Sequence, residues 1–141
     1  MRFGRVVQVV WIAGFVIGTT THVMDLASGG ANTYEPLPMA VRVFWISLTL
    51  FDPLAVMLLA FRRRAGIVLG LAVILVDIAV NWTVFVAIDG LSLFAVVCQT
   101  AFAVFLVATA RVLWRWMRTG REVTQHLQEA PAASTSGTAA S

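Results

Sequence analysis

The sequence LTLFDPLAVMLL, at residues 48–59, has the character of a membrane-spanning helix that contains two unusual residues. Apart from Asp52 and Pro53, all of its side chains are compatible with hydrocarbon. An ionisable residue inside such a segment is rare, and it nearly always faces the interior of a helix bundle or a water-filled cavity. The stretch therefore predicts a helix that crosses a bilayer and turns one polar position toward other helices.

The composition of the whole chain also favours a membrane protein. Of its 141 residues, 60% are hydrophobic and 12% are charged, and the mean hydropathy is +0.88. Soluble domains are about 45–50% apolar and about 25% charged. A chain this short has too much surface for its volume to bury so many apolar side chains in an aqueous core. We therefore expect an integral membrane protein, and we do not interpret the net charge of +3 as a nucleic-acid-binding signal.

Four apolar segments can each supply the roughly 20 residues that a spanning helix needs. They lie at residues 6–27, 39–61, 66–88 and 91–117, and turn-forming or charged sequences separate them. The first segment is long enough to span, and no clean A-x-A cleavage site follows it, so we interpret it as a retained helix. The sequence thus predicts an all-α membrane protein with one four-helix transmembrane domain over residues 1–118.

The remaining residues, 119–141, are predicted to form a cytoplasmic tail. Their first part, within RTGREVTQHLQE, can continue the fourth helix for a few turns, whereas the final APAASTSGTAAS is a low-complexity sequence. Because that sequence has little apolar surface to bury, we expect the tail to be largely disordered.

The positions of the arginines predict the orientation of the helices. All ten basic residues are arginines, and all except Arg42 lie before the first segment, between the second and third, or at and beyond the end of the fourth. The positive-inside rule then places both termini in the cytoplasm and makes the four helices an antiparallel bundle in the cell membrane.

Several polar residues fall at similar depth in the predicted bundle. At about 1.5 Å per helical residue, Asp52 lies about 13 Å and Asp77 about 16 Å from the cytoplasmic end. Asn81 follows Asp77 by one helical turn on the same face, and Gln99 lies in the outer half of the fourth helix. Two carboxylates that are close together in a low dielectric do not both carry charge, so we expect at least one proton on the pair Asp52 and Asp77.

Further candidate ligand-binding residues lie near this set. His22 and Asp25 share a face near the outer end of the first helix. Pro53 removes one backbone hydrogen bond, which leaves the carbonyl of Thr49 free to serve a ligand or a water molecule. Trp82 lies deeper than an interfacial tryptophan should. The alternative is purely structural, because buried Asn and Gln often serve only as interhelical hydrogen bonds worth about 1 kcal/mol.

Two pairs of glycines have the GxxxG spacing that lets membrane helices approach closely. They are Gly14 with Gly18 and Gly66 with Gly70. Such a pair can form the contact face of a homodimer, so the sequence allows a dimer without requiring one.

Known signatures of cofactor and metal binding are missing from the sequence. It contains no HExxH, CxxC, Walker, GxSxG or GxGxxG motif, and Cys98 is its one cysteine. His22 and His126 are predicted on opposite sides of the membrane. We therefore expect no metal site and no cofactor, and we interpret Cys98 as a small packing residue.

Two strings resemble a known family. HVMDL, at residues 22–26, and FWISLTLFD, at residues 44–52, resemble the EXPERA family, which contains the emopamil-binding sterol isomerases and the sigma-2 receptor. The resemblance implies a four-helix fold whose two acids, here Asp25 and Asp52, line a lipid-facing pocket for sterol-like or cationic amphiphilic ligands. Ser47, five residues before Asp52, matches the family's serine-to-acid spacing. The chain departs from the pattern in having Asp where the family's second helix has Glu, in its shorter outer loop and in the position of His22.

Three functional hypotheses follow. In the first, a pocket in the outer half binds a hydrophobic sterol- or isoprenoid-like molecule, and its lining residues are Asp25, Asp52, Asp77, Asn81 and Gln99. An enzymatic version would use Asp52 and Asp77 as acid and base in isomerising a double bond. The second is a small proton-coupled transporter. The third is an assembly protein without a ligand. Because the cytoplasmic halves of the helices are almost purely apolar, the sequence favours a one-sided pocket over alternating access.

Overall fold

The chain folds into four long α-helices and connecting turns. The computed structural model describes residues 2–29, 33–35, 37–88 and 91–134, with side chains as far as Arg118 apart from that of Ile88. The helices are α1 (Arg2–Gly29), α2 (Met39–Ala60), α3 (Arg64–Ile88) and α4 (Leu93–Ser134). Each is long and apolar enough to cross a membrane, and the described residues contain no strand. The predicted all-α fold, with four helices long and apolar enough to span a membrane, is confirmed for the described residues.

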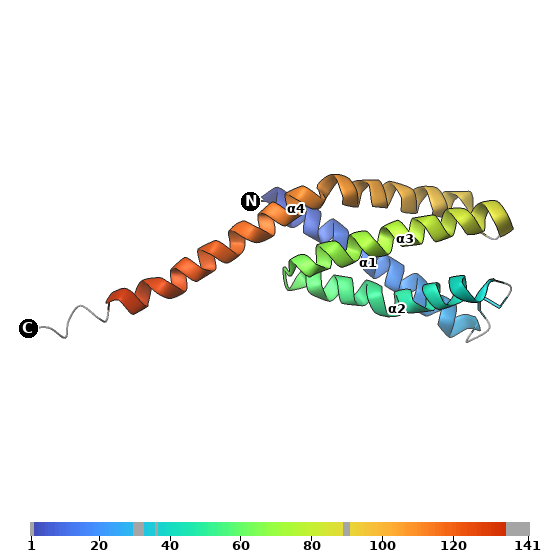
Figure 1. The fold of residues 1–141 in the computed structure, drawn as a ribbon, viewed down its shortest axis with the longest axis horizontal. Helices are drawn as coiled ribbons and strands as arrows, with labels where there is room; N and C mark the ends of the chain where they lie inside the picture. The colour runs from blue at the N-terminus through green and yellow to red at the C-terminus, as the bar shows by residue number, and fades with distance from the viewer. Residues whose placement is uncertain (1, 30–32, 36, 89–90, 135–141) are drawn as a thin grey trace, which may run out of the picture.

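The fourth helix differs from our expectation at its end. The continuation of the helix for a few turns beyond residue 117 was allowed by the sequence, but α4 runs without a break to Ser134, into the low-complexity sequence that we expected to be disordered (Figure 1). Glu, Gln, Leu, Arg and Ala dominate the sequence between residues 121 and 130, and these residues have high helix propensity. That local preference outweighs the lack of apolar surface to bury. Residues 135–141 of the expected disordered tail lie outside the described residues.

The helices pack in the order of the chain around the bundle. α1 contacts α2 and α4, and α3 contacts the same two helices on the other side. Figure 1 shows the first residues of α1, the turn from α2 to α3 and the departure of α4 from the bundle at one end, on the left. The end of α1 and the beginnings of α2 and α4 lie at the other end. We call these the arginine end and the opposite end.

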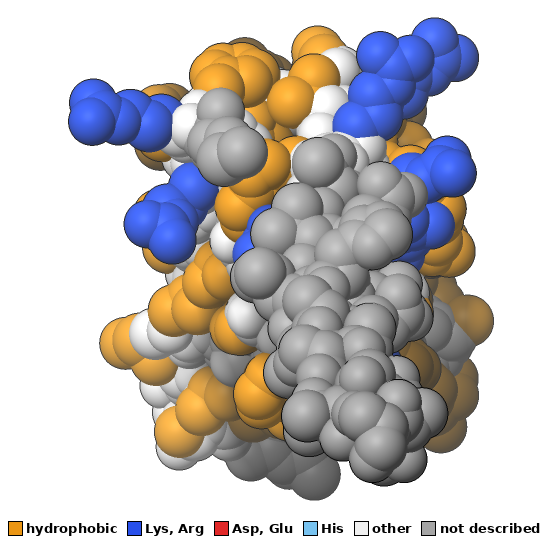
Figure 2. Space-filling view, turned by 90° about the vertical axis from the view of Figure 1, so that its left-hand side faces the viewer, with side chains coloured by type: hydrophobic (Ala, Val, Ile, Leu, Met, Phe, Trp, Pro, Cys, Tyr) orange, Lys and Arg blue, Asp and Glu red, His pale blue; other side chains and the backbone are white. Residues whose placement is uncertain are grey.

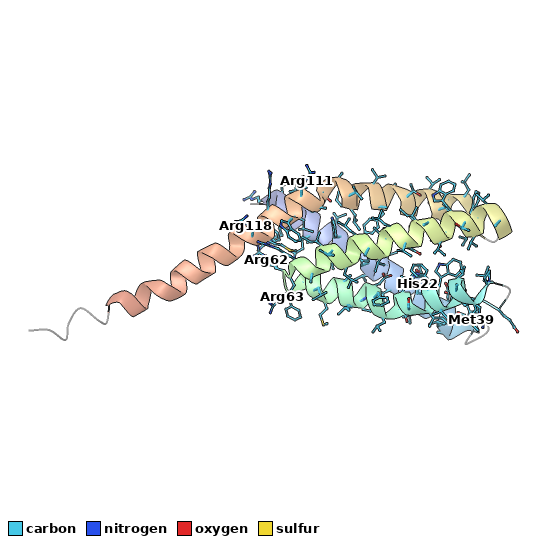
Figure 3. All side chains as sticks on the ribbon, in the orientation of Figure 1. His22, Met39, Arg62, Arg63, Arg111 and Arg118 are labelled. Carbon is cyan, nitrogen blue, oxygen red and sulfur yellow. The ribbon has the colours of Figure 1, made fainter. Side chains whose placement is uncertain are left out.

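The outer surface of the bundle is apolar. Large hydrophobic side chains on all four helices point outward, among them Ile17, Leu50, Val86 and Val104, which are 64–77% exposed. Figure 3 shows side chains of this kind projecting along the whole length of the bundle. Exposed apolar surface of this extent is typical of contact with lipid and would cause aggregation in water. The buried positions instead form one core in which Trp11, Leu48 and Leu106 are almost completely enclosed.

The glycines of the GxxxG pairs face the interior of their own bundle. A Cβ on Gly14 would overlap the ring of Phe102, and one on Gly70 would lie 3.0 Å from the ring of Phe15. Gly18 faces Asp52, and Gly66 faces the end of α2. The pairs thus let helices of one chain approach closely. They give no support to the homodimer that their spacing allowed, which stays a prediction.

Replacing Gly14 with valine should destabilise the bundle by about 1–3 kcal/mol, because the new side chain must displace Phe102 from a packed position. The free energy of unfolding can be measured in detergent micelles by titration with a denaturing detergent. Ala13→Val is the matched control, since the exposed Ala13 lies next to Gly14 on the outer surface. Equal stability of the two variants would show that Gly14 is not a close-packing position.

Candidate functional site

A chain of side-chain hydrogen bonds links three helices in the half of the bundle nearer the opposite end. The indole Nε1 of Trp45 on α2 donates to Oδ1 of Asn81 on α3 over 3.0 Å. Nδ2 of Asn81 donates to Oε1 of Gln99 on α4, and Nε2 of Gln99 donates back to Oδ2 of Asp77 on α3. The structure therefore brings together Asp77, Asn81 and Gln99, which the sequence placed at similar depth.

Asp52 lies beside this chain, on the side of α1. Its side chain is only 5% exposed, as is that of Asp77, and the two carboxyls are close enough to interact electrostatically. Oδ2 of Asp52 lies 2.8 Å from the position that a Cβ on Gly18 would occupy, so the carboxyl sits directly against the backbone of α1. Among the described residues, none forms a hydrogen bond with the Asp52 side chain.

Three buried side-chain polar atoms have no hydrogen-bond partner among the described residues. Nε of Arg64 is at the arginine end, and the other two, Oδ1 of Asp77 and Nδ1 of His22, are in this half of the bundle. His22 is on α1, one turn after Gly18, and Figure 3 shows it in the half of the bundle away from the arginines. Buried polar groups in proteins nearly always have a hydrogen-bond partner, because leaving one unpaired costs about 1–3 kcal/mol. These atoms and the Asp52 carboxyl therefore retain hydrogen-bonding capacity that no described residue uses.

Asp25 belongs to a different part of the structure from Asp52. It is exposed near the end of α1, and its Oδ2 accepts a hydrogen bond of 3.1 Å from the hydroxyl of Tyr34 in the following turn. The ring of Tyr34 packs edge-on against that of Trp45, with centroids 5.1 Å apart. Contacts thus run from Asp25 through Tyr34 and Trp45 to Asn81. Asp25 also interacts electrostatically with His22, as their shared face predicted.

Tyr34 provides a pH-dependent test of this connection. Burial raises the pKa of Tyr34 above its ordinary value of about 10, and the neighbouring Asp25 raises it further. The unfolded chain therefore loses the phenol proton at a lower pH than the folded chain does. The stabilisation is complete below about pH 10 and is lost as the pH rises above it, by up to about 1.4 kcal/mol per pH unit.

The chain is well suited to this measurement because Tyr34 is its only tyrosine and it has no lysine. The unfolding temperature of the wild type should fall between pH 9.5 and pH 11, whereas that of Tyr34→Phe should change much less over the same range. A parallel fall in both proteins would mean that another group controls stability at high pH.

Two other predicted ligand-binding residues, Thr49 and Trp82, form hydrogen bonds outside the polar cluster. The hydroxyl of Thr49 donates to the carbonyl of Ile46, within α2, and α2 continues as one helix through Pro53. Trp82 is 37% exposed, and its Nε1 donates to Oγ1 of Thr100 over 3.1 Å. Its position is on the outer surface between α3 and α4, because Asn81, one residue earlier, already occupies the inward face.

The sequence interpretation missed three residues that contribute to the polar cluster. Trp45 and Tyr34 connect the cluster to the surface, and Gly18 provides the close approach of α1 to Asp52. A signal existed for Trp45, since an indole N–H inside a membrane span needs an acceptor and Asn81 was predicted at a similar depth. No sequence signal identified the partner of Gly18, because that depends on how α1 and α2 are rotated against each other.

The half of the bundle nearer the arginine end is filled by packed side chains. Nε2 of the buried Gln8 donates to the carbonyl of Leu59 over 2.6 Å, and Nε1 of Trp11 donates to Oγ1 of Thr109 over 3.0 Å. Both bonds cross between helices and satisfy polar groups without water. Around them the core consists of fully buried apolar residues such as Leu59, Leu106 and Leu113.

The polar cluster does not have the composition of a metal centre. Within the described parts of the chain, no three side chains of His, Cys, Asp or Glu come close enough to hold an ion. Comparison of the chain with models of protein families, with curated proteins and with solved structures finds no match, so the resemblance to the EXPERA family stays a prediction.

Proposed function

We propose that this protein binds a hydrophobic, sterol- or isoprenoid-like small molecule in the outer half of its bundle. The polar or cationic group of that molecule would interact with Asp52 and Asp77. The observation that carries the proposal is the Asp52 carboxyl, which is buried against Gly18 and lacks a hydrogen bond to any described side chain. A carboxylate at this depth costs about 2.5–3.5 kcal/mol on insertion scales, so its retention favours a role in binding.

The arrangement suits one polar group on an otherwise apolar ligand. The Asp52 carboxyl, Oδ1 of Asp77 and Nδ1 of His22 come from three different helices and have no partners among the described residues. A ligand amine or hydroxyl can donate to the carboxyls, and the hydrocarbon of the ligand can remain in contact with lipid and with apolar side chains. A positively charged amine would also offset the charge of an ionised carboxylate.

The packing of side chains in the half of the bundle nearer the arginine end argues against the transporter hypothesis. Alternating access requires a water-accessible path from both faces to the same site. Here the bonds of Gln8 to Leu59 and of Trp11 to Thr109 close that half with satisfied polar groups and apolar packing. A pocket open toward the opposite end needs no such path.

The assembly hypothesis explains only part of the cluster. Trp45, Asn81, Gln99 and Oδ2 of Asp77 satisfy one another, which is what interhelical hydrogen bonds do. The same explanation does not extend to Asp52, because an apolar residue there would pack against α1 at lower cost. We therefore assign the hydrogen-bonded chain to positioning Asp77, and Asp52 to the ligand.

The proposed orientation is an antiparallel bundle in the cell membrane with both termini in the cytoplasm. Its support is the gathering of arginines around one end, which Figure 2 shows with no acidic side chain visible on that face. The polar cluster then lies on the outer side of the membrane midplane.

Lipid mass spectrometry of the purified protein tests the proposal. The wild type should retain a hydrophobic small molecule that is distinct from bulk phospholipid. Asp52→Asn should lose at least about 90% of it, because an amide cannot pair with a cation and a tenfold loss of affinity needs only about 1.4 kcal/mol. Glu35→Gln is the matched control, since it makes the same chemical change at an exposed position. Finding only bulk phospholipid in all three proteins, or equal amounts of the molecule in wild type and Asp52→Asn, would contradict the proposal.

A further inference from the structure

The side chains of the three arginines at the turn between α2 and α3, at residues 62–64, point in different directions. After α2, the backbone N–H of Arg62 donates to the carbonyl of Leu59 over 2.9 Å, and that of Arg63 donates to the carbonyl of Leu58 over 2.8 Å. These are the two bonds of a Schellman motif, which needs a left-handed residue just after the helix. Arg62 holds that position with a φ of 53°, where glycine is usual. A residue other than glycine is uncommon in this conformation.

Two of the three arginines are held by tryptophans of α4. The guanidinium of Arg62 lies 3.9 Å from the centroid of the Trp116 ring, and that of Arg64 lies 5.1 Å from the Trp114 ring. Such cation–π contacts fix both side chains on the α4 side of the turn.

Arg63 remains exposed on the other side. It makes no ion pair or ring contact with the described residues, and it forms the rim of a hollow of about 440 Å³. The other lining residues are Met57 and Leu58, on the last turn of α2, and Phe61, which directly follows the helix. Figure 3 shows Arg63 at the end of α2, with Arg62 between it and α4. The hollow thus has an apolar wall within the membrane and one unpaired cation at its edge.

The charged side chains that the structure describes at this end are all arginines. The sequence has no acidic residue between Asp52 and Asp77, and Figure 2 shows arginines and no acidic side chain on the described surface of this end. A ligand here must therefore bring its own negative charge. A guanidinium binds a phosphate through two parallel hydrogen bonds, which makes phosphate the best-matched anion.

We propose that this hollow binds one anionic phospholipid of the leaflet at the arginine end, with its phosphate on Arg63 and an acyl chain over Met57, Leu58 and Phe61. An amphiphile is the occupant that fits, because the apolar wall belongs to a spanning helix and continues into the lipid-facing surface of α2. The site is at the end of the bundle away from Asp52 and Asp77, so it does not depend on the proposed function.

Native mass spectrometry can measure this binding directly. Delipidated full-length protein in detergent is titrated with dioleoylphosphatidylglycerol or with dioleoylphosphatidylcholine, and the fraction carrying one lipid is recorded. The wild type should prefer the anionic lipid. Arg63→Gln should weaken its binding about fivefold or more, as expected for one arginine near a charged headgroup. Arg5→Gln, which removes the same charge from an exposed position at the same end, should have a smaller effect.

Three results would overturn the proposal. Equal weakening by Arg63→Gln and Arg5→Gln would indicate diffuse attraction. Equal binding of the two lipids, which share the phosphate and differ in net charge, would show that the site does not select an anionic lipid. Displacement of the lipid by glycerophosphate at equal concentration would identify a site for free phosphate. Phe61→Ala should also weaken binding, because the acyl chain loses part of its wall. Unfolding temperatures of all variants within about 2 °C of the wild type establish that the losses are local.

Discussion

Replacing Gly18 with leucine should strongly weaken binding at the Asp52 site without removing any titratable residue. Even a Cβ at this position would lie 2.8 Å from Oδ2 of Asp52, so a leucine must displace the carboxyl and occupy space beside it. Overpacking of this kind costs about 1–3 kcal/mol. If that cost falls on the bound state, the affinity should drop by up to about 100-fold. The measurement is the half-saturating concentration of a sterol that carries a tertiary amine.

Gly18→Ala should give a smaller loss in the same direction, and Ala13→Leu, on the exposed face of the same helix, should leave the affinity unchanged. A folded Gly18→Leu protein that binds the amine-bearing sterol as tightly as the wild type would place the site away from Asp52. The unfolding temperature of each variant separates loss of binding from loss of fold.

Replacing Asn81 with leucine should have the largest effect on stability in the polar cluster. Asn81 accepts from Trp45 and donates to Gln99, so its removal leaves groups on two other helices without partners. Interhelical hydrogen bonds in membrane proteins are worth about 0.6–1.7 kcal/mol each. We expect the free energy of unfolding to fall by about 2 kcal/mol, measured by titration with a denaturing detergent in micelles.

Two other variants serve as comparisons for Asn81→Leu. Val86→Leu, on the lipid-facing surface of the same helix, should change the free energy of unfolding by less than about 0.5 kcal/mol. Asp52→Asn should also change it little, because the Asp52 carboxyl has no hydrogen bond to a described residue to lose. A large loss of stability in Asp52→Asn together with none in Asn81→Leu would reverse the roles that we assign to the two residues.

The general fold could be predicted from sequence because the bilayer imposes a simple requirement. Each span needs about 20 apolar residues, and the turns that separate spans contain Gly, Pro or charged residues. The segments at 6–27, 39–61, 66–88 and 91–117 accordingly fall in the four helices. The full extent of α4, to Ser134, was not predicted, because it depends on helix propensity in a polar sequence and the search for apolar spans does not weigh that propensity.

The polar cluster could be predicted only in part. The depth of a residue in the membrane follows from counting residues along its helix, but the rotation of that helix about its axis does not. Asp77, Asn81 and Gln99 come together because their depths match and their helices are neighbours. Trp82 was expected in the same set, yet it follows Asn81 by one residue, which turns it about 100° around the helix and onto the outer surface. The contact of Asp52 with Gly18 depends on the packing of α1 against α2, which hydropathy leaves undetermined.

The central claim, that Asp52 and its neighbours form a ligand site, is tested most directly by photolabelling. A sterol that carries both a tertiary amine and a diazirine is irradiated with the purified protein, and the labelled peptides are located by mass spectrometry. We predict labelling concentrated around Gly18 and His22 on α1 and around Asp52 on α2, competed by the unlabelled amine sterol and lost in Asp52→Asn. Labelling spread over the lipid-facing surface and unchanged in Asp52→Asn would contradict the account.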